Sequence, residues 1–115
     1  MNLTEQQINT LEEARRAYGN TAQLLVSIEE LNELACVVAK FPRYDTEEEA
    51  RAKLHQKALD EVADVYIVLN HIETILGLET SEIASRIASK IDRVNRWVST
   101  NDKFSQTLVD RNVVE

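Results

Sequence analysis

Acidic side chains at helical spacing are the feature of this sequence that could do chemistry. Glu30 and Glu33 lie three residues apart, and so do Glu61 and Asp64 further along the chain. On an α-helix, residues three apart share a face, so each pair would present two carboxylates in one direction. Each pair lies next to aliphatic residues on its helix, whereas a surface helix usually carries its acids on the side opposite its apolar face. Two such helices packed together would bring four carboxylates to one place.

Four gathered carboxylates need a compensating charge. Buried carboxylates without partners are costly, so they either take up protons or bind a cation. Hard divalent cations such as Mg²⁺ or Mn²⁺ prefer oxygen ligands. The spacing therefore predicts a metal site between two helices, with these four acids as ligands. The competing interpretation is that both pairs form solvated acidic ridges, with Lys57 bridging to Glu61 one helical turn away.

Other metal and cofactor chemistries fit the sequence less well. A di-iron helical bundle usually carries Glu-x-x-His motifs, and neither His55 nor His71 follows a glutamate by three residues. Gly19 and Gly77 are the only glycines, which leaves no room for a phosphate-binding loop or a dinucleotide-binding fingerprint. We therefore expect both histidines to be hydrogen-bonded packing residues.

A basic stripe follows later in the chain. Arg86, Lys90, Arg93 and Trp97 share one stripe of a predicted helix, and Arg96 lies beside it. These side chains could form a solvated face, or they could neutralise phosphate charge beside a metal. Because a metal held by acids can polarise a phosphoryl group, the acidic pairs and the basic stripe together favour a phosphate-containing substrate.

Four helices are expected to position these residues. The chain has 115 residues with two glycines and one proline, and Ala, Leu, Glu, Ile and Val are abundant, which favours one all-α domain with few, long elements. We predict helices over about 4–18, 21–40, 46–76 and 81–98, followed by a C-terminal arm at 99–115. The half of the third helix over 58–76 is apolar almost all round, which predicts burial at the centre or against another copy of the chain.

Local signals mark the ends of the predicted helices. Capping boxes reduce the number of unpaired N–H groups at a helix start, glycine suits a helix end, and the residue before a proline disfavours helical geometry. The signals in this chain are capping boxes at Thr4–Gln7 and Thr46–Glu49, glycines Gly19 and Gly77, and Pro42 after Phe41.

Composition argues against several classes of function. The net charge of −7 argues against a basic surface for nucleic-acid polymers. Cys36 is the only cysteine, so no intrachain disulfide can form, which fits a reducing compartment. No apolar run approaches membrane-spanning length, and the N-terminus lacks a signal-peptide pattern. We expect a cytoplasmic protein without a membrane partner.

Together, these motifs resemble those of a known enzyme family. Glu29-Glu30-Leu31-Asn32-Glu33 followed by Glu61-Val62-Ala63-Asp64 is similar to the EExxE…ExxD signature of MazG-type nucleoside triphosphate pyrophosphohydrolases. These enzymes belong to the all-α NTP pyrophosphatase superfamily. The segment 90–96 resembles the basic segment that follows in family members. The resemblance covers residues 20–98 of a single domain at 1–115.

The resemblance implies an activity and an assembly. It implies Mg²⁺-dependent cleavage of a nucleoside triphosphate to the monophosphate and pyrophosphate, with Mn²⁺ as a possible substitute and nucleotide-pool clean-up as the role. It also implies a four-helix bundle-like MazG-type fold in which helices of two chains pack together, in a homodimer or homotetramer. By motif match, the metal ligands would be Glu30, Glu33, Glu61 and Asp64, with Glu29 as a supporting acid. The phosphate contacts would be Lys90, Arg93 and Arg96.

Alternative interpretations differ in substrate or in whether the chain is an enzyme. A related pyrophosphohydrolase could act on dUTP or phosphoribosyl-ATP, and the pocket for the base would decide between these substrates. Trp97 is a candidate to stack on a base, as are Tyr18, Tyr44 and Tyr66, although each suits a packing role better. A helical interaction protein without activity is a third interpretation, against which the presence of all four predicted ligands argues.

Overall fold

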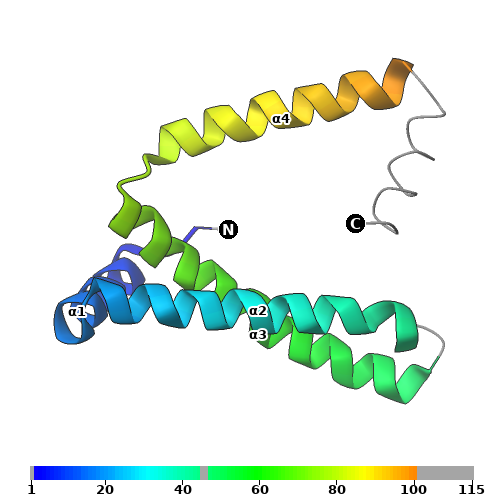
Figure 1. The fold of residues 1–115 in the computed structure, drawn as a ribbon, viewed down its shortest axis with the longest axis horizontal. Coiled ribbons are helices and arrows are strands. Elements are labelled where there is room, and N and C mark those ends of the chain that lie inside the picture. Colours follow the sequence, from blue (N-terminus) through cyan, green and yellow to red (C-terminus); the bar gives the residue numbers. More distant parts are fainter. Residues whose placement is uncertain (1, 45–46, 101–115) are drawn as a thin grey trace. The chain divides into compact units, whose positions relative to one another are not determined.

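The chain folds into helices joined by short connections. The computed structural model describes residues 2–44 and 47–100. They form four helices: α1 (Glu5–Tyr18), α2 (Asn20–Tyr44), α3 (Glu48–Leu76) and α4 (Thr80–Thr100) (Figure 1). These ranges contain no strand, so the predicted all-α class is confirmed. The predicted arm beyond Thr100 lies outside the described residues.

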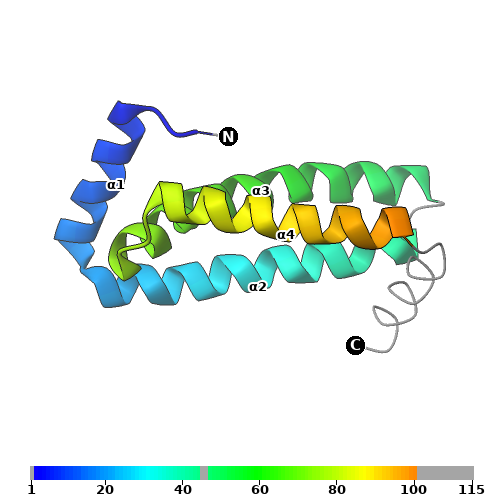
Figure 2. The ribbon, with the colours of Figure 1, turned by 90° about the horizontal axis from the view of Figure 1, so that it is seen from above.

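The helices divide into two compact units between Gly77 and Leu78. The first unit holds α1, α2 and α3, and the second holds α4. Within the first unit, α2 and α3 form an antiparallel hairpin, and α1 contacts both of them at the end where α2 begins (Figures 1 and 2). No helix of the described residues has the length and apolar character needed to cross a membrane.

The start and the end of α1 follow the local signals in the sequence. The Thr4 hydroxyl accepts a hydrogen bond from the Gln7 backbone N–H at 3.1 Å, and the Gln7 side chain accepts one from the Thr4 N–H at 2.8 Å. The predicted capping box is thus confirmed. Gly19 follows the helix with φ of +90°, a conformation that residues with a Cβ rarely adopt. This glycine lets α2 begin immediately at residue 20.

The end of α2 differs from the prediction. A break at Phe41–Pro42 was expected, but the helix continues through Pro42 to Tyr44. Pro42 has no N–H to donate to the carbonyl four residues earlier, and its ring crowds that carbonyl, so the last turn of α2 forms against the local preference. The half-buried Phe41 side chain lines a cavity with Ala52 and His55 of α3. Phe41 in this last turn thus lies beside the start of α3.

The third helix begins slightly later than predicted and ends as predicted. Its N-cap is Glu47, whose side chain makes no capping hydrogen bond, and Thr46 of the predicted second capping box lies outside the described residues. At the other end Gly77 adopts the left-handed conformation with φ of +68°. The Gly77 N–H donates to backbone oxygens of Glu73 and Thr74, which closes the last turn.

The interface between α2 and α3 is unusually polar. Among the described residues, Val37 and Val68 are the buried hydrophobic side chains, whereas the buried polar ones are Gln23, Ser27, Glu61 and His71. Full burial of hydrophobic side chains is thus limited to two valines among the described residues, although buried apolar area is what normally stabilises a helical hairpin in water. We infer that this hairpin depends on further contacts for its stability.

A stripe of aliphatic residues on α2 does not face α3. It consists of Leu24, Ile28, Leu31, Ala35 and Val38. Leu24 is half-buried, but Ile28 is 56% exposed and Val38 is 58% exposed. Helix α3 likewise exposes Leu59, Val62, Tyr66 and Leu69. Contiguous apolar surface of this kind commonly marks an interaction site.

Candidate metal centre

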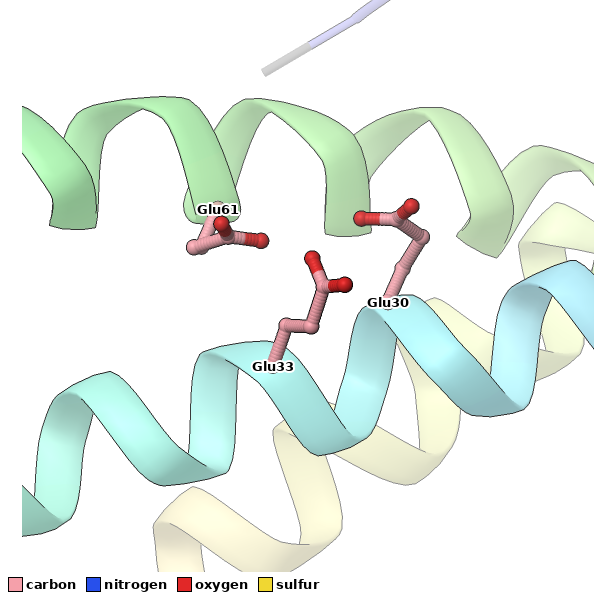
Figure 3. A group of neighbouring side chains, drawn as sticks. All are labelled: Glu30, Glu33 and Glu61. Atoms are coloured by element: carbon pink, nitrogen blue, oxygen red, sulfur yellow. The ribbon is translucent and has the colours of Figure 1, made fainter.

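Three of the predicted acids meet between α2 and α3. Glu30 and Glu33 project from α2 toward α3, and Glu61 projects from α3 toward them (Figure 3). One carboxylate oxygen from each residue lies within 4.8 Å of those of the other two. The spacing on α2 makes the first two acids neighbours, and antiparallel pairing of the helices places the third opposite them. The predicted convergence of acids from two helices is confirmed for these three residues.

Burial distinguishes this cluster from a solvated ridge. Glu61 is only 3% exposed and Glu30 is half-buried, while Glu33 is exposed. The Oε2 atoms of Glu30 and Glu61 are buried and find no hydrogen-bond partner among the described residues. A buried carboxylate oxygen without a partner is costly, because it has lost its hydration without compensation. These oxygens therefore require a proton or a cation.

The surroundings of the cluster favour bound protons when no cation is present. Burial raises the pKa of Glu30, and the neighbouring charges of Asp64 and Glu33 raise it further. A hydrogen bond with Glu61 raises the pKa of Glu33, and the charge of Glu61 adds to this effect. A hydrogen bond between two carboxyl groups needs a proton on one of them. That proton compensates the charge that a metal ion would otherwise neutralise.

The other two predicted acids lie at the edge of the cluster. Asp64 is half-buried on α3 and its charge raises the pKa of Glu30, but it does not belong to the group of three acids whose oxygens converge. Glu29 is exposed on α2 and also stands outside this group. Asp64 therefore lies near Glu30, whereas Glu29 remains accessible to solvent.

Lys57 extends the cluster on α3. Its Nζ lies 3.1 Å from Oε1 of Glu61, and its side chain is 60% exposed. The hydrogen bond and the charge of Glu61 raise the pKa of Lys57. The competing interpretation of the sequence predicted this bridge and also predicted that both acidic pairs would be solvated. The bridge exists, but Glu61 is buried, so the ridge interpretation is wrong for that residue.

The predicted substrate-binding residues lie on α4, in the second unit. Lys90, Arg93, Arg96 and Trp97 are all exposed. Nε of Arg96 lies 3.6 Å from Oδ2 of Asp92, and the Arg93 guanidinium lies 6.0 Å from the centroid of the Trp97 ring, at the outer limit of a cation–π contact. The basic groups thus point to solvent from one helix, and their role toward a substrate remains a prediction.

Comparisons of the chain with protein-family models, with curated proteins and with solved structures found no match. The resemblance to MazG-type enzymes therefore rests on the two acidic motifs and the basic segment. The structure brings Glu30, Glu33 and Glu61 together, which bears on metal binding and not on the family. Three converging carboxylates form the donor set that a hard divalent cation prefers.

A second polar cluster, which the sequence did not indicate, joins α1 to α3. Nη1 of Arg15 donates to Oδ1 of Asn70 at 3.1 Å and lies 2.9 Å from Nδ1 of His71. A guanidinium can only donate, so Nδ1 must accept and the proton of the neutral ring resides on Nε2. His71 is 3% exposed, which confirms its predicted packing role. The exposed His55 shows no such burial.

This cluster predicts a pH dependence of stability. Burial lowers the pKa of His71, and the positive charge of Arg15 lowers it further. The unfolded chain therefore binds more protons than the native state. The contribution of neutral His71 to the free energy of unfolding is complete above its pKa in the unfolded chain, which is about 6.5. This contribution is lost as the pH falls through the lower pKa of His71 in the folded protein. We expect the stability difference between the parent and a His71→Gln variant to shrink as the pH falls from 7.5 to 5.

Urea denaturation of both proteins across this range would measure the difference. Subtracting the two curves removes the contribution of Glu30 and Glu33, whose raised pKa values act in the opposite sense and are shared by both proteins. A difference that stays constant with pH would contradict the expectation.

Proposed function

We propose that this protein is a Mg²⁺-dependent pyrophosphohydrolase that cleaves a nucleoside triphosphate to the monophosphate and pyrophosphate. The observation that carries the proposal is the convergence of Glu30, Glu33 and Glu61, with buried oxygens on Glu30 and Glu61 that lack partners. The resemblance of the acidic motifs to those of MazG-type enzymes supplies the reaction. A metal site alone would not distinguish a hydrolase from a metal-stabilised structural protein.

The residues present fit a hard divalent cation. The donor set consists of carboxylates only, and orphaned oxygens point to a missing positive charge. When bound, Mg²⁺ supplies charge that polarises a phosphoryl group and offsets the negative phosphates. Glu30, Glu33 and Glu61 would hold it, and the half-buried Asp64 near Glu30 would add negative charge to the site. The exposed Glu29 is the acid free to orient water and accept its proton.

The basic residues of α4, in the second unit, are the proposed phosphate contacts. Lys90, Arg93 and Arg96 carry exposed cationic groups that suit phosphate oxygens. Arg93 and Trp97 lie near each other on the same face, so a nucleotide could meet a charge and an aromatic surface together. We propose that these residues bind the triphosphate and the base.

A homodimer or homotetramer is part of the proposal. The exposed aliphatic residues of α2 and α3 would be covered by helices of a second chain, which also accounts for the polar interface inside each hairpin. Helix α4 adds a further exposed stripe, with Ile87 at 55%, Ile91 at 63% and Val98 at 54% exposed. Burial of these side chains supplies the apolar area that a single hairpin lacks.

The products of hydrolysis test the proposed reaction. We expect the purified protein, with Mg²⁺ and a panel of nucleoside triphosphates that includes dUTP, to release one pyrophosphate per monophosphate formed. Chelation of the metal should stop the reaction. Phosphoribosyl-ATP in the same panel tests the related substrate. Stoichiometric orthophosphate from a preparation free of pyrophosphatase would contradict the proposal, and no product from any substrate would favour a non-enzymatic interaction protein.

A further inference from the structure

The buried acid Glu61 has two oxygens in different situations. Oε1 is 3.1 Å from the Lys57 ammonium, whereas Oε2 is buried without a hydrogen-bond partner among the described residues. Lys57 is therefore the ion-pair partner of the acid that the proposed metal site needs. One ammonium carries less positive charge than three ionised carboxylates carry negative charge, so Lys57 alone would not neutralise the converging acids.

We propose that Lys57 is an internal counter-cation of the acidic cluster, which occupies Glu61 in the metal-free protein and is displaced when a divalent cation binds. Lys57 thereby sets the metal affinity of the site. The inference rests on the metal site of the proposed function, and it assigns a role to a residue outside the matched motifs. It concerns binding of the ion and holds for any substrate.

Electrostatics makes the two cations competitors. A divalent ion bound by Glu30, Glu33 and Glu61 would lie within a few ångströms of the Lys57 ammonium, because both contact the same carboxylate. Like charges at that separation repel strongly where water is partly excluded. A carboxylate shared with an ammonium is also a poorer donor to a metal, since part of its charge is already neutralised. Metal binding must therefore work against the Lys57–Glu61 pair.

The geometry also allows the Lys57 ammonium to separate from Glu61. Its side chain is 60% exposed, so the ammonium can return to water without a large desolvation change. The pair has lysine four residues before glutamate, which is the less favourable order on a helix. Asp60 is exposed three residues further along and already attracts the Lys57 charge. It offers a second partner for the ammonium once Glu61 is engaged by metal.

Direct Mn²⁺ binding to the full chain, without nucleotide, tests the proposal. We expect Lys57→Gln to bind Mn²⁺ about tenfold more tightly than the parent, because a hydrogen bond between charged groups no longer competes. Lys53→Gln is the matched control, since it removes the same charge one turn earlier on α3. Lys53 pairs with Glu49 at 3.8 Å, and both side chains are exposed. Its Mn²⁺ affinity should stay within about twofold of the parent value.

The outcomes separate this inference from the proposed function. If the parent binds Mn²⁺ and Lys57→Gln binds it equally or less tightly, the counter-cation role is wrong and the metal site stands. The role is also wrong if Lys53→Gln gains as much affinity as Lys57→Gln, because the effect is then one of net charge. If none of the three proteins binds Mn²⁺, the metal site and the inference both fail.

A measurement on the unaltered protein avoids dependence on a variant. Limited acetylation with and without Mg²⁺, read by peptide mass spectrometry, reports how accessible and reactive each lysine is. We expect Mg²⁺ to increase the acetylation of Lys57 relative to that of Lys53, because the displaced ammonium loses its partner Glu61. A ratio that Mg²⁺ leaves unchanged, at a concentration that saturates the site, would overturn the displacement.

Discussion

Glu61→Gln is expected to lower turnover by roughly a hundredfold or more, because even the loss of groups that only orient metal ligands costs about 10- to 100-fold. The glutamine amide keeps the size of the side chain but carries no charge to bind the ion. Glu61 is the most buried acid of the cluster and the one that α3 contributes to it. Initial rates of pyrophosphate release, measured across Mg²⁺ concentrations, would check this result.

The same substitution should leave the metal-free protein at least as stable as the parent. Loss of the helical pair with Lys57 costs only a few tenths of a kcal/mol. Loss of a buried charge beside Glu30 and Glu33 relieves repulsion and removes an orphaned carboxylate oxygen. The rise in melting temperature that Mg²⁺ gives the parent should disappear, since stabilisation by a ligand follows its affinity for the native state.

Glu49→Gln is the matched control for this experiment. Glu49 also lies on α3 and also pairs with a lysine, but it is exposed and far along the helix from the cluster. Its loss should change neither turnover nor the effect of Mg²⁺ on melting. A Glu61→Gln protein with parental activity and parental stabilisation by Mg²⁺ would rule out the metal site.

Leu69→Lys is expected to dissociate the proposed oligomer. Leu69 belongs to the exposed aliphatic surface of α3, in the half of that helix that is apolar almost all round. A symmetric dimer carries the substitution once in each chain, so its effect on the free energy of association is doubled. Burial of one leucine contributes about 1.5–3 kcal/mol, so the dissociation constant should rise by more than about a hundredfold. Sedimentation at micromolar concentration would show the parent as a dimer or tetramer and the variant as a monomer.

Gln56→Lys is the control for Leu69→Lys, because it adds the same charge to an exposed polar position on the same helix. Substitutions at free surface positions usually change stability by less than about 0.5 kcal/mol. Both variants should therefore behave alike if the aliphatic surface is free in solution. A parent protein that sediments as an active monomer would contradict the oligomer directly.

Local sequence signals were enough to predict the caps of α1, the glycine that ends α3 and the shared face of the acids on α2. The Thr4–Gln7 box and the positive φ values of Gly19 and Gly77 depend on residues at most four positions apart, so local chemistry decides them. The pairing of Glu30 with Glu33 on one face follows from helical periodicity in the same way. These predictions needed no knowledge of how the helices pack.

The choice of helix faces that pack together depends on the tertiary structure. The aliphatic stripe through Ile28 and Val38 is exposed, whereas α2 turns the face with Ser27 and Glu30 toward α3. Periodicity defines each face of a helix but does not specify which one a partner covers, because that depends on the other surfaces to be buried.

Contacts between residues far apart in the sequence could not be predicted either, because they also depend on which helix faces pack together. Helix α2 continues past Pro42 with Phe41 beside α3, and Arg15 lies against His71, which is 56 positions later in the sequence. Only the register of the hairpin places Glu61 opposite Glu30 and Glu33 and buries it beside Lys57. The type and spacing of the acids are local properties, whereas their burial and convergence depend on which helices pack together.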